Sequence, residues 1–343
     1  MSDADPKLAR RKFVGTAVVA GTTLWGAAAH ADKAPRTNPA GIPLRPLGKL
    51  GVPVSVMGLG GWHIGAIKEK TQAIELMHAA LDEGLTFWDN AWDYHGGRSE
   101  ELMGEALAAP GKRDQVFLMT KNCERDYAGS MQHLEDSLRR LRTDHIDLWQ
   151  FHEINYDNDP QWLLERGGLK AALDAKKAGK VRFIGFTGHK HPDIHLAALR
   201  LKFPWDAVQM PINILDTHYR SFQKHVVPVA RKQGVGVIGM KSLGGGAPEG
   251  NFLMRGRTGL TAEQCLRYAL GVDVSTLVVG IMSLEQLKAN AAVARDFSPL
   301  PPAERDTLLR QLRDEASDGR YELFKSTHLF DGAHHRKQHG FPV

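Results

Sequence analysis

Eight short apolar runs recur along the chain, and they constrain its fold more than any other feature of the sequence. Val, Ile, Leu and aromatic residues dominate them, and each run is nearly continuous, which is typical of strands buried on both faces. The runs lie at residues 54–60, 85–89, 116–120, 146–152, 181–187, 207–210, 235–240 and 276–280. Their starts are about thirty residues apart on average, the length of one strand-plus-helix repeat. The pattern therefore predicts a parallel sheet whose strands alternate with helices.

Helical patterns fill the intervals between these runs. Residues 69–84 place apolar side chains on one face and end at Gly84, and Ser99 is the predicted N-cap of the next helix. Eight parallel units close naturally into a (β/α)8 TIM barrel, an α/β fold. The rival fold, an open doubly wound sheet, carries a Gly-rich phosphate loop after its first strand. Here the first strand ends in GLGGWHIG, and no G-x-G-x-x-G leads into a helix, so we predict the barrel.

The segments that flank the eight units complete the predicted architecture. Residues 42–53 are expected to form a β-hairpin that plugs the barrel floor. The sequence after residue 300 predicts one more helix followed by a tail. Because no linker divides the repeats, we assign residues 44–343 to one barrel domain and residues 32–43 to a linker.

Residues 1–31 have the pattern of an export signal. The paired arginines Arg10 and Arg11 precede Phe13 and a weakly hydrophobic run rich in Ala, Gly and Thr, which ends in a small-x-small pattern at Ala31. This pattern resembles a twin-arginine signal peptide, and we leave it out of the fold prediction. The run is too short and too rich in glycine to be a stable membrane anchor. The signal predicts the twin-arginine export machinery as a partner and a periplasmic location, or a cytoplasmic one if the signal is not used.

Charge and cysteine content bear on the partners that the chain can have. The formal net charge is +5, but the Lys and Arg residues are interspersed, so we do not predict nucleic-acid binding. The two cysteines, Cys123 and Cys265, are far apart and form no CxxC pair. Free thiols are the default for such a pair, and a disulfide stays an open alternative.

Four polar residues follow three successive strands. Asp89 ends the second strand, Tyr94 lies in the loop behind it, Lys121 ends the third strand and His152 ends the fourth. Because the carboxyl ends of barrel strands form one mouth, we expect these side chains to converge there.

Together these residue types suit proton transfer to a carbonyl. A free tyrosine has a pKa of about 10, and a neighbouring lysine cation lowers it by favouring the phenolate. An aspartate beside the lysine would hold the ammonium in place, and a histidine can donate a hydrogen bond to a substrate oxygen. We therefore predict that Tyr94 gives a proton to the oxygen while a hydride reaches the carbon.

The segments that carry these residues resemble the aldo/keto reductase family over nearly all of residues 44–300. FWDNAWDYHGGRSEELMGEAL and HLEDSLRRLRTDHIDLWQFH are similar to two signature segments of that family, and MTKN is similar to its lysine segment. GKVRFIGFTGHK stands where the family usually reads G-V-S-N. The resemblance implies NAD(P)H-dependent reduction of aldehydes or ketones. In this reaction Tyr94 is the general acid/base, Lys121 lowers its pKa, Asp89 orients Lys121 and His152 positions the carbonyl.

The resemblance also implies a nicotinamide cofactor across the barrel mouth. Gln209 matches the glutamine that holds the carboxamide, Met240 replaces an aromatic residue beside the ring, and Lys241 is the cation of a loop over the pyrophosphate. The implied cofactor-binding set is Gly61, Trp62, Thr187, Gly188, Gln209, Met240, Lys241, Leu243, Gly280, Gln286 and Asn290. Gln286 and Gly280 replace the usual arginine and a common lysine near the adenosine end. NADPH is the family default, and NADH stays possible.

Trp62, Trp92 and Glu153 are the predicted walls of the substrate pocket. An acid beside His152 is expected to disfavour anionic substrates. The tail contains several histidines at irregular spacing without a carboxylate cluster, which predicts a lid or a flexible tail and no metal site. These histidines are His328, His334, His335 and His339.

Two other functions stay open at this point. The first is a redox sensor or regulatory subunit of the same fold, which binds the cofactor but turns over slowly. The second is a metal-dependent barrel hydrolase or isomerase, which requires several Asp, Glu or His ligands at strand ends. The pairing of Tyr94 with Lys121 favours the reductase.

Overall fold

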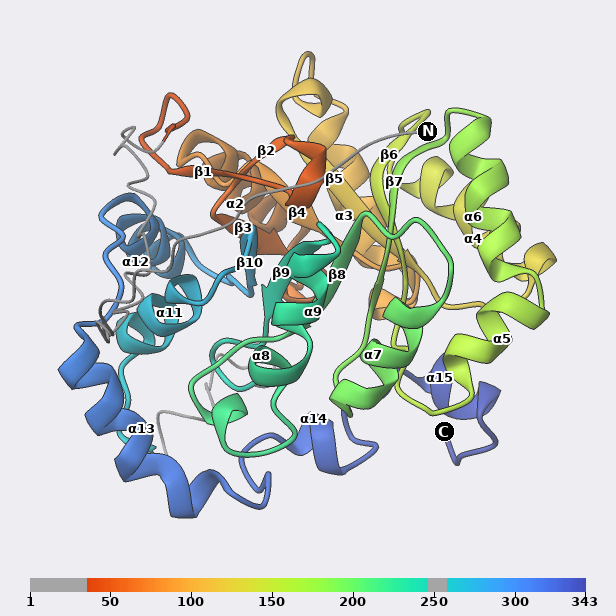
Figure 1. Ribbon diagram of the computed structural model, residues 1–343. Helices are drawn as coiled ribbons and strands as arrows, with labels where there is room; N and C mark the ends of the chain where they lie inside the picture. Colours follow the sequence, from red (N-terminus) through yellow and green to blue (C-terminus); the bar gives the residue numbers. More distant parts are fainter. Residues whose placement is uncertain (1–35, 246–257) are drawn as a thin grey trace, which may run out of the picture. The chain divides into compact units, whose positions relative to one another are not determined.

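The computed structural model describes residues 36–245 and 258–343 (Figure 1). The predicted export signal at residues 1–31 lies outside these residues, as do the first residues of the predicted linker. The remainder of that linker packs on the barrel, because Ile42 is buried and the Asn38 side chain donates to the Gly84 carbonyl at 2.7 Å. Over the described residues, every helix is too short or too polar to cross a membrane.

The core of the fold is a closed barrel of eight parallel strands, as predicted. The strands follow one another around the barrel in sequence order, and β10 closes it by pairing with β3. The strands are β3 (Met57–Gly60), β4 (Phe87–Asp89), β5 (Phe117–Asn122), β6 (Ile146–Phe151), β7 (Val181–Thr187), β8 (Ala207–Pro211), β9 (Gly236–Met240) and β10 (Thr276–Val279). Every barrel strand except β5, β7 and β9 is buried from end to end.

A hairpin of β1 (Leu44–Pro46) and β2 (Pro53–Ser55) precedes the barrel. The first predicted strand, 54–60, was therefore too long, because Val54 and Ser55 pair with β1 and only Met57–Gly60 joins the barrel. The side chains of Leu47 and Val54 pack with inward-facing barrel residues, so the hairpin fills the floor as expected. Those barrel residues are Phe87, Met119, Leu148, Ala207, Ile238 and Val278.

Helices surround the strands and bury their apolar faces against them (Figure 1). Within the described residues, the helices and 3-10 turns before the C-terminal segment are η1 (Gly48–Leu50), α1 (Gly61–Ala66), α2 (Lys70–Asp82), η2 (Tyr94–Gly97), α3 (Arg98–Leu107), η3 (Arg113–Gln115), α4 (Tyr127–Arg140), α5 (Asp159–Glu165), α6 (Gly168–Lys177), α7 (Pro192–Arg200), η4 (Leu215–Thr217), α8 (Phe222–His225), α9 (Val227–Lys232), α11 (Ala262–Gly271) and α12 (Leu284–Arg295). Ser99 is not the N-cap of α3, because Gly97 takes that position. The Ser99 hydroxyl is buried and donates to the Gly61 carbonyl at 2.6 Å.

The C-terminal segment contains three helices, where the sequence predicted one helix and a tail. They are α13 (Pro302–Ala316), α14 (Leu323–Ser326) and α15 (Ala333–Gln338), drawn in blue in Figure 1. A buried ion pair anchors α14, since Lys325 Nζ lies 2.7 Å from Asp216 Oδ1 and 2.9 Å from Glu322 Oε2. A second anchor is Asp331, which accepts from the Tyr156 hydroxyl at 2.7 Å. The segment is therefore packed against the barrel.

Candidate active site

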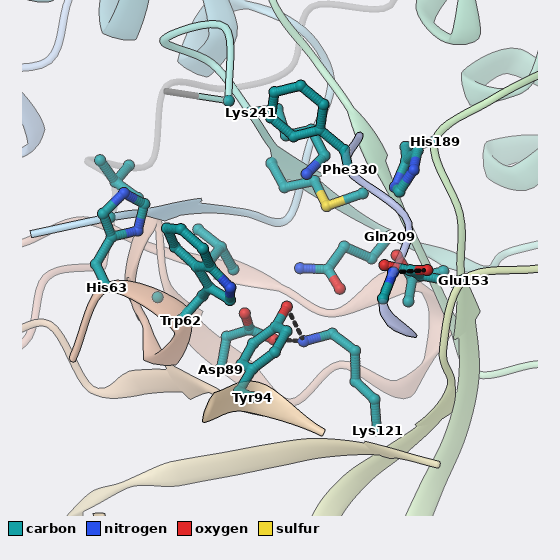
Figure 2. Close-up of a pocket in the computed structure, with 18 of the residues that line it drawn as sticks. Trp62, His63, Asp89, Tyr94, Lys121, Glu153, His189, Gln209, Lys241 and Phe330 are labelled. Carbon is teal, nitrogen blue, oxygen red and sulfur yellow. Dashed lines mark hydrogen bonds and ion pairs between the residues drawn. The ribbon is translucent and has the colours of Figure 1, made fainter. Parts of the chain in front are cut away.

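A cavity of about 1290 Å³ opens at the carboxyl ends of the barrel strands. It is larger than most sites for small ligands, which measure roughly 300–1,000 Å³, so it has room for a dinucleotide and a small substrate together. Strand-end residues from around the barrel line it, and the C-terminal segment supplies one wall through residues 329–334. Figure 2 shows the labelled side chains converging on this space.

Asp89, Tyr94 and Lys121 meet at the base of the cavity. Lys121 Nζ lies 2.5 Å from Asp89 Oδ1 and donates to the Tyr94 hydroxyl at 3.3 Å (Figure 2). It also donates to the carbonyl of Asn90 at 2.6 Å. Lys121 and Asp89 are buried, and Tyr94 is partly open to the cavity. The structure thus brings these three of the four expected residues into direct contact with one another, and His152 lines the same cavity.

The pKa of Tyr94 is raised well above its ordinary value, contrary to the effect expected from Lys121. Burial is the largest cause, because it penalises the phenolate. Asp89 and then Asp93 add to it, because their negative charges oppose a phenolate. Tyr94 is therefore a neutral phenol near neutral pH, and it can donate a proton.

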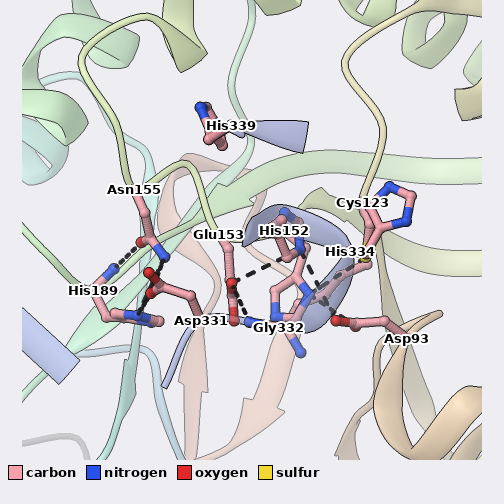
Figure 3. Close-up of polar contacts among 12 residues, drawn as sticks. Asp93, Cys123, His152, Glu153, Asn155, His189, Asp331, Gly332, His334 and His339 are labelled. Atoms are coloured by element: carbon pink, nitrogen blue, oxygen red, sulfur yellow. Dashed lines mark hydrogen bonds and ion pairs between the residues drawn. The ribbon is translucent and has the colours of Figure 1, made fainter. Parts of the chain in front are cut away.

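His152 follows β6 and faces Tyr94 edge-on, with ring centroids 5.4 Å apart. Its Nδ1 atom lies 3.0 Å from Asp93 Oδ1 (Figure 3). Burial lowers the pKa of His152 against the opposing attraction of Asp93. The backbone here is held by Arg125, whose guanidinium donates to the carbonyls of His152 and Glu153 at 2.9 and 3.0 Å. The imidazole is therefore fixed at the cavity wall in a neutral state.

Most of the residues expected to bind the cofactor line the cavity. They are Trp62, Thr187, Gln209, Met240, Lys241, Leu243, Gly280, Gln286 and Asn290. Two observations fit a nicotinamide dinucleotide. Gln209 Oε1 is buried and has no hydrogen-bond partner within residues 36–245 and 258–343, so it can accept from a carboxamide. Burial lowers the pKa of Lys241, and a phosphate beside it would favour the cation again.

Gly61 and Gly188 do not line the cavity, and close packing explains why these positions hold glycine. A Cβ at Gly61 would lie 2.4 Å from the carbonyl oxygen of Asp89. A Cβ at Gly188 would lie 2.5 Å from the carbonyl oxygen of Ile154. These two glycines let the backbone approach the strand ends closely, and their contact with the cofactor stays a prediction.

The expected substrate walls Trp62, Trp92 and Glu153 all line the cavity. Glu153 differs from expectation in its charge, because burial and then Asp93 and Asp331 raise its pKa well above the usual range. A carboxyl group with a raised pKa repels anions less strongly, and the discrimination against anionic substrates stays a prediction. Glu153 instead accepts a hydrogen bond from the Gly332 backbone at 3.0 Å and joins the C-terminal segment to the barrel (Figure 3).

Several cavity residues were missed by the sequence prediction. His63 occupies the space beside Gly280, where a Cβ would lie 2.0 Å from its ring. Its place next to Trp62 in GGWHIG was the available signal. His189, Phe330 and Asp331 also line the cavity. The place of His189 just after the end of β7 was an available signal. Nothing in the local sequence indicates the place of Phe330 and Asp331, since the C-terminal segment reaches the mouth only through tertiary packing.

Comparisons with known proteins agree with this geometry. The profile of the Aldo/keto reductase family matches residues 56–259. Aldo-keto reductase YhdN of Bacillus subtilis (strain 168) is 35% identical over 198 residues, which cover 53% of this chain and 56% of that protein. Aldo-keto reductase yakc [NADP(+)] of Schizosaccharomyces pombe (strain 972 / ATCC 24843) is 30% identical over 227 residues, which cover 62% of this chain and 64% of that protein. The chain thus spans less than two thirds of the length of these two relatives.

A solved structure extends the likeness over more of the chain. The aldo-keto reductase AKR11C1 from Bacillus halodurans, in its holo form, superposes with a TM-score of 0.67 at 27% identity. The match covers 82% of this chain and 99% of that one.

The tight packing of Gly61 can be tested by substitution. We expect Gly61→Ala to destabilise the fold by about 1–3 kcal/mol, because the new methyl group must displace the end of β4. The matched control is Gly271→Ala in α11, where a Cβ would meet only Pro299, at 3.4 Å. Thermal unfolding measures both variants. Equal melting temperatures for Gly61→Ala and the unsubstituted protein would contradict the packing argument.

Proposed function

This chain belongs to the aldo/keto reductase family, and we propose that it is an NAD(P)H-dependent oxidoreductase that reduces aldehyde or ketone carbonyls to alcohols. The observation that carries the proposal is the contact of the Tyr94 hydroxyl with the Lys121 ammonium at 3.3 Å, inside a cavity large enough for cofactor and substrate. A phenol held against a buried cation is suited to give up a proton to a developing alkoxide.

Each residue of the site has a defined part in this reaction. Tyr94 donates its proton to the carbonyl oxygen, and Lys121 stabilises the phenolate that forms. Asp89 holds the ammonium in reach of Tyr94 through the 2.5 Å ion pair. His152 orients the carbonyl from the neighbouring strand end. Bound NAD(P)H supplies the hydride.

NADPH is the cofactor that we propose, with NADH as the alternative. The relative yakc carries NADP(+) in its name, and Gln209 and Lys241 are placed to hold the carboxamide and a phosphate. Gln286 is not a phosphate clamp, because its Oε1 atom accepts from the Met282 backbone at 2.9 Å. Initial rates with each cofactor separate the two possibilities.

The role of Tyr94 predicts a large loss of activity on substitution. Tyr94→Phe should lower kcat by about 10²–10⁴-fold, because the proton donor is removed. The affinity for NADPH should change little. The matched control is Tyr127→Phe, since Tyr127 is an exposed tyrosine that contacts Asp174 at 3.1 Å.

The measurement is the oxidation of NADPH with a panel of aldehydes and ketones, with cofactor binding followed by tryptophan fluorescence. Turnover by Tyr94→Phe equal to that of Tyr127→Phe would contradict the assigned role. Tight NADPH binding without any turnover by the unsubstituted chain would overturn the reductase and favour a redox sensor.

For residues 1–31 we propose a twin-arginine signal that sends the folded protein to the periplasm. The paired Arg10 and Arg11, the weakly hydrophobic run and the small residues up to Ala31 support it. Cytoplasmic residence is the alternative, and it fits a cofactor that is abundant there.

Mass spectrometry of the protein from fractionated cells tests the signal. We expect a mature chain that begins after Ala31 in the periplasm, and retention in the cytoplasm when both arginines are replaced by lysine. An intact N-terminus found only in the cytoplasm would show that the signal is not used.

A further inference from the structure

Four metal-ligating side chains meet beside the reaction site, although the sequence indicated no metal centre. Asp93 comes from the loop after β4, Cys123 follows β5, His152 follows β6 and His335 lies in α15. One ligand atom from each lies within 4.8 Å of the others. The irregular spacing of the tail histidines concealed this cluster, because the other three residues come from distant strand ends.

His335 gives independent support for a ligand at this place. Its side chain is fully buried, and neither ring nitrogen has a hydrogen-bond partner within the described residues. Its Nε2 atom lies 4.0 Å from Asp93 Oδ2 and 3.9 Å from Glu153 Oε2, beyond hydrogen-bond distance. A buried polar group without a partner costs about 1–3 kcal/mol. A cation between these side chains would remove that cost.

The distances within the cluster are close to those of a tetrahedral zinc site. Zn–S bonds of about 2.3 Å and Zn–N bonds of about 2.05 Å imply a sulfur-to-nitrogen edge of about 3.6 Å and a nitrogen-to-oxygen edge of about 3.4 Å. Cys123 Sγ lies 3.6 Å from His152 Nδ1, and His152 Nδ1 lies 3.0 Å from Asp93 Oδ1 (Figure 3). His335 Nε2 lies 4.0 Å from Asp93 Oδ2, which is longer than such an edge, so His335 must move toward the other three ligands to complete the tetrahedron.

We propose that Asp93, Cys123, His152 and His335 bind one zinc ion. The mixed sulfur, nitrogen and oxygen donors suit this metal, and the carboxylate with a thiolate balances its charge. Cys123 is a free cysteine in the structure. Binding forms the zinc–sulfur bond and releases the thiol proton to solvent.

A neighbouring group of Glu124, His133 and His334 is a weaker candidate. His334 Nε2 already pairs with Glu124 Oε1 at 3.0 Å, and His133 Nδ1 accepts from the Cys123 backbone at 3.3 Å. These contacts explain that group without a metal.

Zinc at this site would change what His152 can do, an effect that rests on the proposed reductase function. If Nδ1 of a neutral His152 carries the proton and donates it to Asp93 in the metal-free protein, Nε2 has no proton to donate. A metal bound to Nδ1 places the proton on Nε2 instead. The ring can then donate a hydrogen bond to the substrate carbonyl. The same ion would hold α15 against the active site through His335.

Cobalt binding to the full-length chain tests the site directly, without reference to turnover. Metal-free protein is prepared by dialysis against a chelator and titrated with Co²⁺, whose spectrum reports thiolate ligation and tetrahedral geometry. We expect a thiolate-to-cobalt charge-transfer band that saturates at about one ion per chain and is lost when Zn²⁺ displaces the cobalt. Absence of that band would overturn the proposal, whatever the outcome of the reductase assays.

Matched variants assign the ligands. Cys123→Ser should abolish the charge-transfer band, whereas Cys265→Ser, which replaces the other buried free thiol, should keep it. His335→Gln keeps the thiol and should weaken cobalt binding by roughly 100-fold. Circular dichroism checks the fold of each variant. If Cys123→Ser does not fold, the cobalt affinity of His335→Gln tests the ligand set by itself. Unchanged cobalt affinity and spectrum in His335→Gln would overturn this ligand set.

Discussion

The buried Lys121 ammonium is the constraint on which the rest of the site depends. A cation that is 1% exposed is costly unless it is paired, and Asp89 and the Asn90 carbonyl supply that pairing from the adjacent strand end. Asp89 lies opposite Met119 in the β4–β5 register, so Lys121 follows on the same face of the sheet toward the mouth. The Tyr94 hydroxyl is the remaining partner of this ammonium. The register of β4 and β5 therefore positions the ion pair on which the proposed chemistry depends, and a shift of that register would separate Lys121 from Asp89.

The sequence was sufficient to predict the residues whose place follows from strand ends. Asp89, Lys121, His152 and Gln209 reach one mouth because parallel barrel strands all point their carboxyl ends the same way. The pKa direction of Tyr94 could not be predicted, since it depends on burial and on carboxylates that only the tertiary structure brings near. The boundary between β2 and β3 was also missed, because the two strands form one nearly continuous apolar run in the sequence.

Local sequence patterns did not predict how the C-terminal segment packs against the barrel. Its polar residues read as a solvent-exposed tail, yet Asp331 is buried, where it pairs with Lys190 at 2.9 Å and accepts from Tyr156. Phe330 packs near Lys241, whose Nζ atom lies 5.7 Å from the ring centroid. The segment thus forms a wall of the cavity through long-range contacts. The proposed zinc ion would link this segment to His152 through His335.

The central claim is that a buried lysine–aspartate pair prepares Tyr94 to donate a proton. The most direct test is the single-turnover rate of hydride transfer from NADPH in a double variant, Asp89→Asn with Lys121→Met, which removes both charges together and leaves no unpaired ion in the barrel. The account predicts a rate about 100-fold or more below that of the unsubstituted protein, with NADPH affinity little changed. Hydride transfer at the original rate in a folded double variant would contradict it.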